Sequence, residues 1–239
     1  QHGARNQVVG HDLNYQAWTG LLALAGEHDG RRIVPALIAD IAGGAHAAVI
    51  NILLALRSRE QTGQGCYLDI AMTDGLFPFM LSALANWAAG NAVPAAGNDL
   101  LTGGSPRYQL YRTADGRHLA AAPLEEHFWQ RFAELIRLPE GSRSQGADPE
   151  TVREMVAGII AAESAAYWED RFEGEDVCCT LVRGLSEALA DTAVVGHHRV
   201  RSGGAAAVDL LTIPGAVNTG GAPSCGQDNQ RFGFERKRL

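Results

Sequence analysis

The longest apolar stretch of the chain, residues 33–56, most constrains the fold, because so many apolar side chains in one run require burial. Residues 34–59 predict one long helix, with Pro35 suited to its first turn. Asp40 and Asn51 interrupt the apolar run, and a membrane span seldom carries such residues without a function. We therefore expect a helix of a soluble protein and no association with a membrane.

Two further features of this helix suggest a functional site. Gly43 and Gly44 lie well inside it, where each glycine costs about 1 kcal/mol relative to alanine. This cost indicates that another backbone segment or a ligand approaches closely there. Asp40 lies one turn earlier on a mostly apolar helix, and a buried carboxylate with a perturbed pKa is a common catalytic group. Residue types alone leave open a purely structural, hydrogen-bonded role for Asp40.

A second candidate site precedes the apolar run at 17–25, where the sequence reads Gly10-His11-Asp12-Leu13-Asn14-Tyr15. Asp12 or a neighbour is suited to begin a helix there. The first backbone N–H groups of a helix have no partner within it and can face a developing negative charge. A histidine beside such a helix start, with an aspartate next to it, is suited to acid/base chemistry. A structural role for His11, in capping or packing, is the alternative.

The rest of the sequence predicts two structured parts that are separated by a linker. Residues 66–72 alternate like a strand, Thr73 and Asp74 are suited to begin a helix over 75–89, and residues 90–106 lack periodicity and predict a linker. Beyond it, residues 108–113 and 118–122 predict a hairpin. The further expected elements are helices at 151–163, 165–172 and 186–190 and strands at 176–183 and 208–213, with a polar tail from 220.

An amphipathic helix is expected directly after the hairpin, with Glu125 in its first turn and its apolar residues facing a core. An acidic residue in a first turn also stabilises the helix dipole, so a solvated carboxylate is the alternative for Glu125. Cys178 and Cys179 fall inside the last strand before residue 186, where neighbours point to opposite faces. We interpret both as packing residues and not as a redox pair.

Composition narrows the function classes. A net charge of -7 argues against a nucleic-acid-binding protein. Four cysteines without zinc or disulfide spacing indicate a reducing compartment, and no secretory leader is seen, so we expect a cytoplasmic protein. The two histidines at 197–198 have no other metal-binding residues near them in the sequence at the spacing of a metal site, so no metal is assigned. Lys237 is the only lysine, a bias typical of GC-rich bacterial genomes.

Five motifs together resemble the class III CoA-transferase superfamily, and within it the α-methylacyl-CoA racemases. They are Gly-His-Asp-Leu-Asn-Tyr at 10–15, Ala-Asp-Ile-Ala-Gly-Gly at 39–44, Arg-Ser-Arg-Glu-Gln-Thr-Gly-Gln-Gly at 57–65, the run 106–116 and Leu-Glu-Glu-His-Phe-Trp at 124–129. The resemblance covers nearly the whole chain in the order of the family. His11 favours the racemase branch, because the transferases usually lack a histidine there.

The resemblance implies roles for individual residues. His11 and Asp40 would be the two bases that flank the substrate α-carbon, and the backbone N–H of Asp12 would face the thioester oxygen. Glu125 would orient or charge-balance His11, and Tyr15 would line the substrate pocket. Gly43 and Gly44 complete the implied substrate contacts. The implied substrate is an acyl-CoA thioester, with no metal or redox cofactor.

The implied fold is α/β: part of a Rossmann-like large domain plus a smaller α+β domain, in an interlocked homodimer when complete. Residues 1–72 would belong to the large domain with the catalytic residues, 73–106 to a helix and linker, 107–204 to the small domain, and 205–239 to a return segment and tail. The family's N-terminal region, which supplies much of the CoA site, is expected to be missing from this sequence.

Three functions follow as hypotheses. The first is a racemase that inverts 2-methylacyl-CoA thioesters by two-base proton transfer through an enolate. The second is CoA transfer between carboxylic acids, with Asp40 as the nucleophile that forms a mixed anhydride. The third is a catalytically silent fragment, since the CoA-binding region is not expected in this chain.

Overall fold

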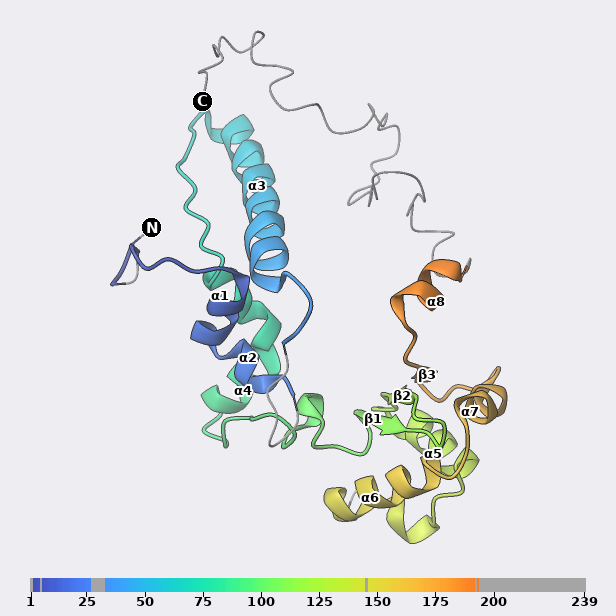
Figure 1. Ribbon diagram of the computed structural model, residues 1–239. Coiled ribbons are helices and arrows are strands. Elements are labelled where there is room, and N and C mark those ends of the chain that lie inside the picture. Colours follow the sequence, from blue (N-terminus) through green and yellow to red (C-terminus); the bar gives the residue numbers. More distant parts are fainter. Residues whose placement is uncertain (1, 5, 27–32, 145, 192, 194–239) are drawn as a thin grey trace. The chain divides into compact units, whose positions relative to one another are not determined.

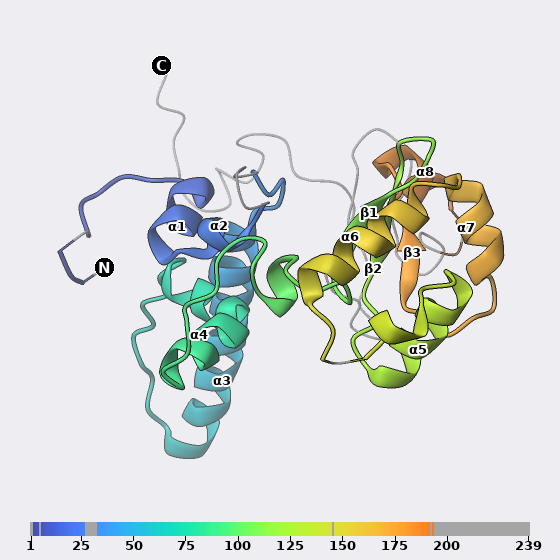
Figure 2. The same cartoon turned by 90° about the horizontal axis from the view of Figure 1, so that it is seen from below.

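The computed structural model describes residues 2–4, 6–26, 33–144, 146–191 and 193. The chain falls into two compact units, residues 1–182 and 183–239. The first unit begins with short helices and continues, after a turn-rich segment, as a small mixed α and β part (Figures 1 and 2). In the second unit the described residues form one helix, α8 (Leu185–Ala190). The predicted mixture of helices and strands is confirmed.

The elements of the first half are helical. They are α1 (Asp12–Thr19), α2 (Leu21–Leu24), the π-helix η1 (Ile38–His46), α3 (Ala47–Thr62), the 3-10 helix η2 (Asp74–Met80), α4 (Leu81–Ala88) and the 3-10 turn η3 (Leu100–Thr102). The second half of unit 1 comprises β1 (Gln109–Arg112), β2 (His118–Ala121), α5 (Glu126–Leu135), the turn η4 (Glu140–Ser142), α6 (Pro149–Ile160), α7 (Ala165–Phe172) and β3 (Cys179–Leu181).

The long helix predicted over 34–59 forms, but with different bounds and geometry. It begins at Ile38, runs as a π-helix to His46, and continues as α3 to Thr62. Its end is set by Gly63, which has a φ of 73° and donates its N–H to the carbonyl of Arg59 at 2.8 Å. The π-helical part contains Asp40 and both glycines.

The glycines inside η1 are explained by a close backbone approach. A Cβ at Gly43 would lie 2.7 Å from the carbonyl oxygen of Met72, and a Cβ at Gly44 2.9 Å from Cγ of Met72. Gly75 of η2 approaches Gly43 even more closely, since a Cβ at Gly75 would overlap the Gly43 backbone. Of the two alternatives raised by the sequence, another backbone is the one that the structure describes.

We expect Gly43→Ala to lower the free energy of unfolding by about 1–3 kcal/mol, because the added methyl overpacks the η1–η2 contact. Gly158→Ala is the matched control: that glycine lies in α6 with nothing near its Cβ direction. The control is expected to gain roughly 1 kcal/mol from helix propensity. Urea unfolding followed by circular dichroism measures both, and equal effects of the two substitutions would contradict the close approach.

The strand predicted over 66–72 does not form in the structure. The chain leaves α3 and returns in extended form toward η2, without a partner strand among the described residues (Figure 1). The helix expected over 75–89 is also different, because its first turns form η2, with Pro78 inside, before α4 continues to Ala88. The predicted linker contains η3 and is ordered by internal bonds, such as that from Gly97 N–H to the Thr102 carbonyl at 2.7 Å.

The predicted hairpin is confirmed. β1 and β2 pair antiparallel with Gln109 opposite Ala121, and the turn between them uses Gly116 at a φ of 79°. β3 adds to β2, also antiparallel, with Leu119 opposite Leu181. The three-stranded sheet has the order β1-β2-β3.

Helices α5, α6 and α7 form a core with the sheet, as the apolar periodicity predicts for α5. Trp129, Phe132, Val156 and Ile160 are almost fully buried there, and the indole N–H of Trp168 donates to the Ile160 carbonyl at 3.0 Å. The predicted strand over 176–183 shortens to Cys179–Leu181. Cys179 packs in the core, and burial raises the pKa of its thiol to about 12. The interpretation of both cysteines as strand packing is wrong for Cys178, which is exposed and precedes β3.

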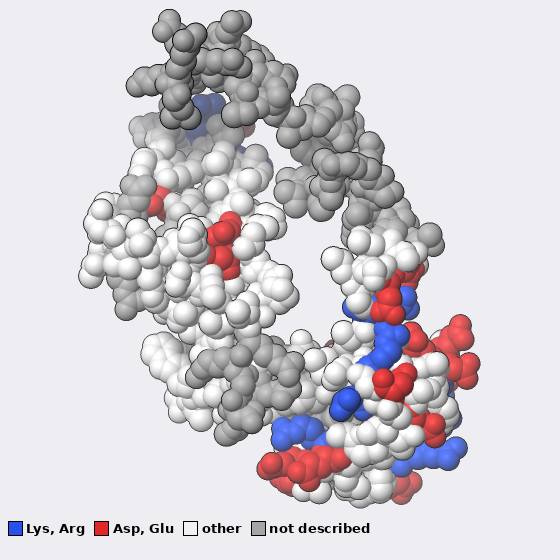
Figure 3. All heavy atoms as spheres, in the orientation of Figure 1, with Lys and Arg blue, Asp and Glu red and all other residues white. Residues whose placement is uncertain are grey.

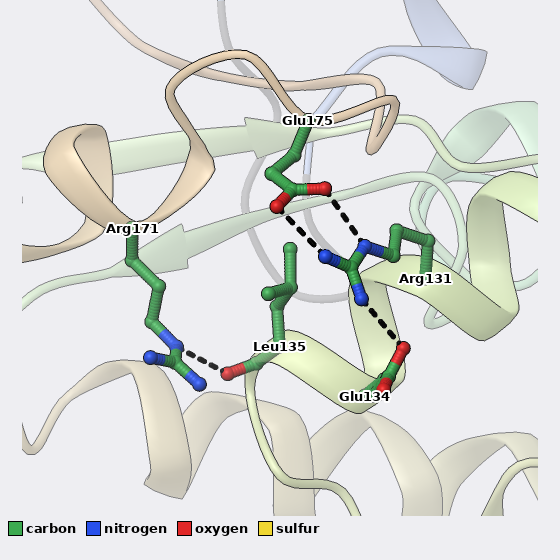
Figure 4. Close-up of polar contacts among 5 residues, drawn as sticks. All are labelled: Arg131, Glu134, Leu135, Arg171 and Glu175. Carbon is green, nitrogen blue, oxygen red and sulfur yellow. Dashed lines mark hydrogen bonds and ion pairs between the residues drawn. The ribbon is translucent and has the colours of Figure 1, made fainter.

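Polar contacts join α5 to the segment after α7 (Figure 4). Arg131 binds Glu175 in a bidentate pair at 2.8 and 2.7 Å and also contacts Glu134 at 2.7 Å. The hydrogen bonds from Arg131 lower the pKa of the Glu175 carboxyl. Arg171 donates to the Leu135 carbonyl at 2.5 Å, so two arginines link the end of α5 to neighbouring segments.

The surface differs between the two halves of unit 1. Charged side chains gather over the α5–α7 part, whereas the α1–α4 part is mainly uncharged on the face shown in Figure 3. On α3, apolar residues that include Ile50, Leu53 and Leu54 are exposed by 57–61%. The continuous helix Ile38–Thr62 is long and apolar enough to cross a membrane: an 18-residue stretch of it has a mean hydropathy of 1.6, and 17% of that stretch is buried. The expectation of no membrane association stays a prediction.

Candidate functional site

The first helix begins where the sequence predicts it. His11 is the N-terminal cap of α1 in extended conformation, and its carbonyl accepts the N–H groups of Asn14 and Tyr15 at 2.8 and 3.1 Å. The Asn14 side chain accepts the His11 N–H at 3.0 Å, which fixes the entry of the chain into the helix. The His11 side chain is exposed, and no hydrogen-bond partner contacts its imidazole within the described part of the chain.

Asp12 connects the two motifs that the sequence singles out. Its side chain is 6% exposed, and its Oδ2 accepts the backbone N–H of Asp40 at 2.9 Å, across 28 residues of sequence. The Nε2 of Gln16 contacts the other oxygen, Oδ1. The helix start that carries His11 and the helix that carries Asp40 are thereby joined.

Asp40 itself lies differently from the expectation. The sequence suggests a buried carboxylate, but the Asp40 residue is exposed, and Asp12 is the buried acid of the pair. On η1 the buried residues are Ala39 and Gly43, so the Asp40 side chain lies on the exposed side of this helix.

Gln16 is the residue that sequence reasoning missed. It is 1% exposed, one turn after Asp12 on the same helix. The i,i+4 spacing of a glutamine after an aspartate is the signal that could have identified it, since such side chains are neighbours on a helix. The burial of Gln16 depends on tertiary packing, which the spacing does not reveal.

Tyr15 lines a cavity. Its hydroxyl donates to the Gly10 carbonyl at 2.8 Å, and its ring meets Trp18 edge to face, with 5.6 Å between the ring centres. Both rings border a cavity of about 440 Å³ whose lining also includes Asp69–Asp74 and Phe77. Tyr15 is the one residue of the predicted site in this lining, so a pocket role for it is compatible with the structure.

The other predicted site residues are separate. Glu125 is the N-terminal cap of α5, with an exposed side chain that makes no capping bond. Among the described residues no contact joins it to His11, so its orienting role stays a prediction. Gly43 and Gly44 contact Met72, and their role toward a substrate also stays a prediction. Within the described ranges no three acidic, histidine or cysteine residues form a metal cluster, and the pair at 197–198 lies outside them.

Sequence comparisons identify the family. The profile of CoA-transferase family III matches residues 1–229. The α-methylacyl-CoA racemase of Mus musculus is 31% identical over 193 residues, covering 79% of this chain and 51% of that protein. The Homo sapiens protein of the same name is 29% identical, and the match covers 100% of this chain and 66% of the human protein. The acetyl-CoA:oxalate CoA-transferase of Acetobacter aceti is 24% identical over 71% of this chain.

Solved structures show the same fold. A crystal structure of the Mycobacterium tuberculosis protein Rv3272 in mutant form has a TM-score of 0.71 at 17% identity, covering 97% of this chain and 64% of that one. A CAIB/BAIF family protein from Brucella suis has a TM-score of 0.61 at 19% identity, covering 82% and 53%. The chain spans about half to two thirds of the length of the racemases that it matches. By its match from residue 1 to residue 229, the chain belongs to CoA-transferase family III.

Proposed function

We propose that this chain carries the acid/base groups of a racemase that inverts the α-carbon of 2-methylacyl-CoA thioesters. The observation that supports the proposal most is the bond from the Asp40 N–H to the Asp12 carboxylate, because it holds Asp40 beside the residue that follows His11. The relatives named α-methylacyl-CoA racemase support the same branch of the family.

The proposed chemistry needs two groups. One base, His11 or Asp40, removes the α-hydrogen as a proton, and the electron pair of the C–H bond enters an enolate whose charge rests on the thioester oxygen. The other group, in its protonated form, delivers a proton to the opposite face and completes inversion. No metal or redox cofactor is required by this sequence of steps.

The enolate oxygen needs hydrogen-bond donors. The Asp12 N–H is a candidate, since it lies at the start of α1 and no acceptor contacts it within the described residues. Tyr15 would line the acyl pocket, Gly43 and Gly44 would contact the substrate, and Glu125 would balance the charge of protonated His11. We place this activity in the cytoplasm.

Inversion is tested with one enantiomer of a 2-methylacyl-CoA thioester and analysis by chiral chromatography. The proposal expects both enantiomers to accumulate in equal amounts. Appearance of CoA on an added carboxylic acid, with the acyl configuration unchanged, would contradict it and favour the transferase function. The exposed Asp40 side chain and the CoA-transferase relatives are the observations that favour this second candidate.

A third candidate is a chain that is catalytically silent by itself. Calorimetric titration with a 2-methylacyl-CoA thioester separates it from the other two. Micromolar binding would count against a silent chain, whereas no binding would favour it.

A homodimer is part of the proposal. The exposed apolar side chains of α3 support a second copy of the chain as their cover, because contiguous exposed apolar surface is typical of protein interaction sites. Light scattering should give a mass of about twice 25.4 kDa. A monomer mass would contradict the dimer.

A further inference from the structure

Gln16 is buried more completely than any acid of the candidate site. It is 1% exposed, its Nε2 contacts Oδ1 of Asp12, and the same nitrogen lies 3.5 Å from the Ala36 carbonyl. The other oxygen of Asp12 accepts the Asp40 N–H. Gln16, Asp12 and the Asp40 peptide thus form one chain of hydrogen bonds from α1 to η1.

We infer that Gln16 is a positioning residue, which fixes the Asp12 carboxylate so that its second oxygen holds the Asp40 peptide. The catalytic consequence rests on the proposed function, whereas the contact itself does not. A carboxylate group turns easily about its last torsion, because that torsion is broad. Two donors, one for each oxygen, define both its plane and its direction. The Gln16 contact therefore determines where the start of η1 lies relative to α1.

A second observation argues against a merely structural role. The Oε1 of Gln16 is buried and has no hydrogen-bond partner among the described residues. A buried acceptor without a donor is costly, and an apolar side chain of similar size would avoid that cost. The residue is therefore poorly suited to filling space, and its Nε2 contact with Asp12 is the feature that an apolar residue could not supply.

The direct test is the protection of the Asp40 amide. In Gln16→Met, which keeps the side-chain length and removes the donor, we expect hydrogen exchange of the Asp40 N–H to accelerate by about 10-fold or more, as local opening becomes easier. The melting temperature is expected to stay equal or to rise. Gln130→Met is the matched control: Gln130 donates to Glu126 at 2.6 Å with the same i,i+4 spacing, but on the exposed face of α5. The control should leave the Asp40 amide unchanged.

An unchanged Asp40 amide in folded Gln16→Met would overturn the inference. If that variant does not fold, NMR of the Gln16 side-chain amide in the unsubstituted chain tests the inference instead. The Gln16 side-chain amide protons should then be shifted from free-amide positions and should respond to Asp12→Asn. Free-amide positions for both protons would likewise overturn the inference.

Activity supplies an independent readout. If the chain racemises acyl-CoA, Gln16→Met should lower kcat by about 10-fold and change KM by less than about 2-fold, because a displaced base weakens the chemical step more than substrate binding. An accelerated Asp40 exchange without racemase activity in the unsubstituted chain would retain the role of Gln16 and reject the proposed function. A loss confined to KM would overturn the positioning role.

Discussion

Replacing His11 by alanine is expected to slow inversion of a 2-methylacyl-CoA thioester by about 10²–10⁴-fold, the usual contribution of a positioned general acid or base. The substitution should not unfold the protein, because the His11 side chain is exposed and only its backbone caps α1. Because the two proposed bases act on opposite faces of the substrate α-carbon, the loss of α-hydrogen exchange should differ between the two enantiomers. Exchange should survive for the enantiomer whose α-hydrogen points toward Asp40 when bound, and it should fail for the enantiomer whose α-hydrogen points toward His11.

Proton NMR in deuterated water, run on each enantiomer separately, measures this asymmetry. His118→Ala is the control, since His118 is exposed on β2, outside the candidate site. An equal loss of exchange for both enantiomers would show that His11 does not serve one face alone. Unchanged inversion in His11→Ala would remove it from the mechanism.

Asp40→Asn is expected to have the complementary effect and a similar magnitude, about 10²–10⁴-fold in inversion. The enantiomer that exchanges in His11→Ala should be the one that fails here. The contact with Asp12 uses the Asp40 backbone N–H, so the asparagine variant keeps it. Because the side chain is exposed, the free energy of unfolding should change by less than about 0.5 kcal/mol.

The Asp40 variant also separates the two enzymatic candidates. As a nucleophile, Asp40 would form a mixed anhydride with the acyl group, with CoA released as the thiol. Hydroxylamine trapping followed by peptide mass analysis detects that adduct. A trapped adduct on Asp40 in the unsubstituted chain, lost in Asp40→Asn, would favour CoA transfer over inversion.

The small mixed part was predictable because its signals are local. The turn at Ala114-Asp115-Gly116 sets the hairpin, and the apolar periodicity of α5 identifies the face that reaches the core. Each of these patterns specifies its own geometry without reference to distant residues. The bounds of α7, Ala165–Phe172, agree with the expectation to the residue.

The first half was less predictable because its geometry depends on partners. Alternation over 66–72 indicates that a strand is possible there, but strand pairing needs a neighbour that the described residues do not supply. Gly43 and Gly44 indicate a close approach to the helix that contains them, but no local pattern specifies that η2 is the approaching segment or that the backbone over Asp40 is π-helical.

The candidate site was also predictable only where its signals are local. The start of α1 at Asp12 follows from local capping signals and was predicted. The bond from Asp12 to Asp40 spans 28 residues, and the burial of Asp12 instead of Asp40 follows from that tertiary contact. Residue type and spacing identified the participants, but their arrangement required the fold.

Inversion by proton transfer at the α-carbon is tested most directly by the deuterium content of the inverted product. One enantiomer of a 2-methylacyl-CoA thioester is incubated with the protein in deuterated water, and the inverted product is isolated at early times. The two-base mechanism predicts that every inverted molecule carries one α-deuterium, because the delivering group exchanges with solvent. Inverted product without deuterium, or no inversion while CoA passes to an acceptor acid, would contradict it.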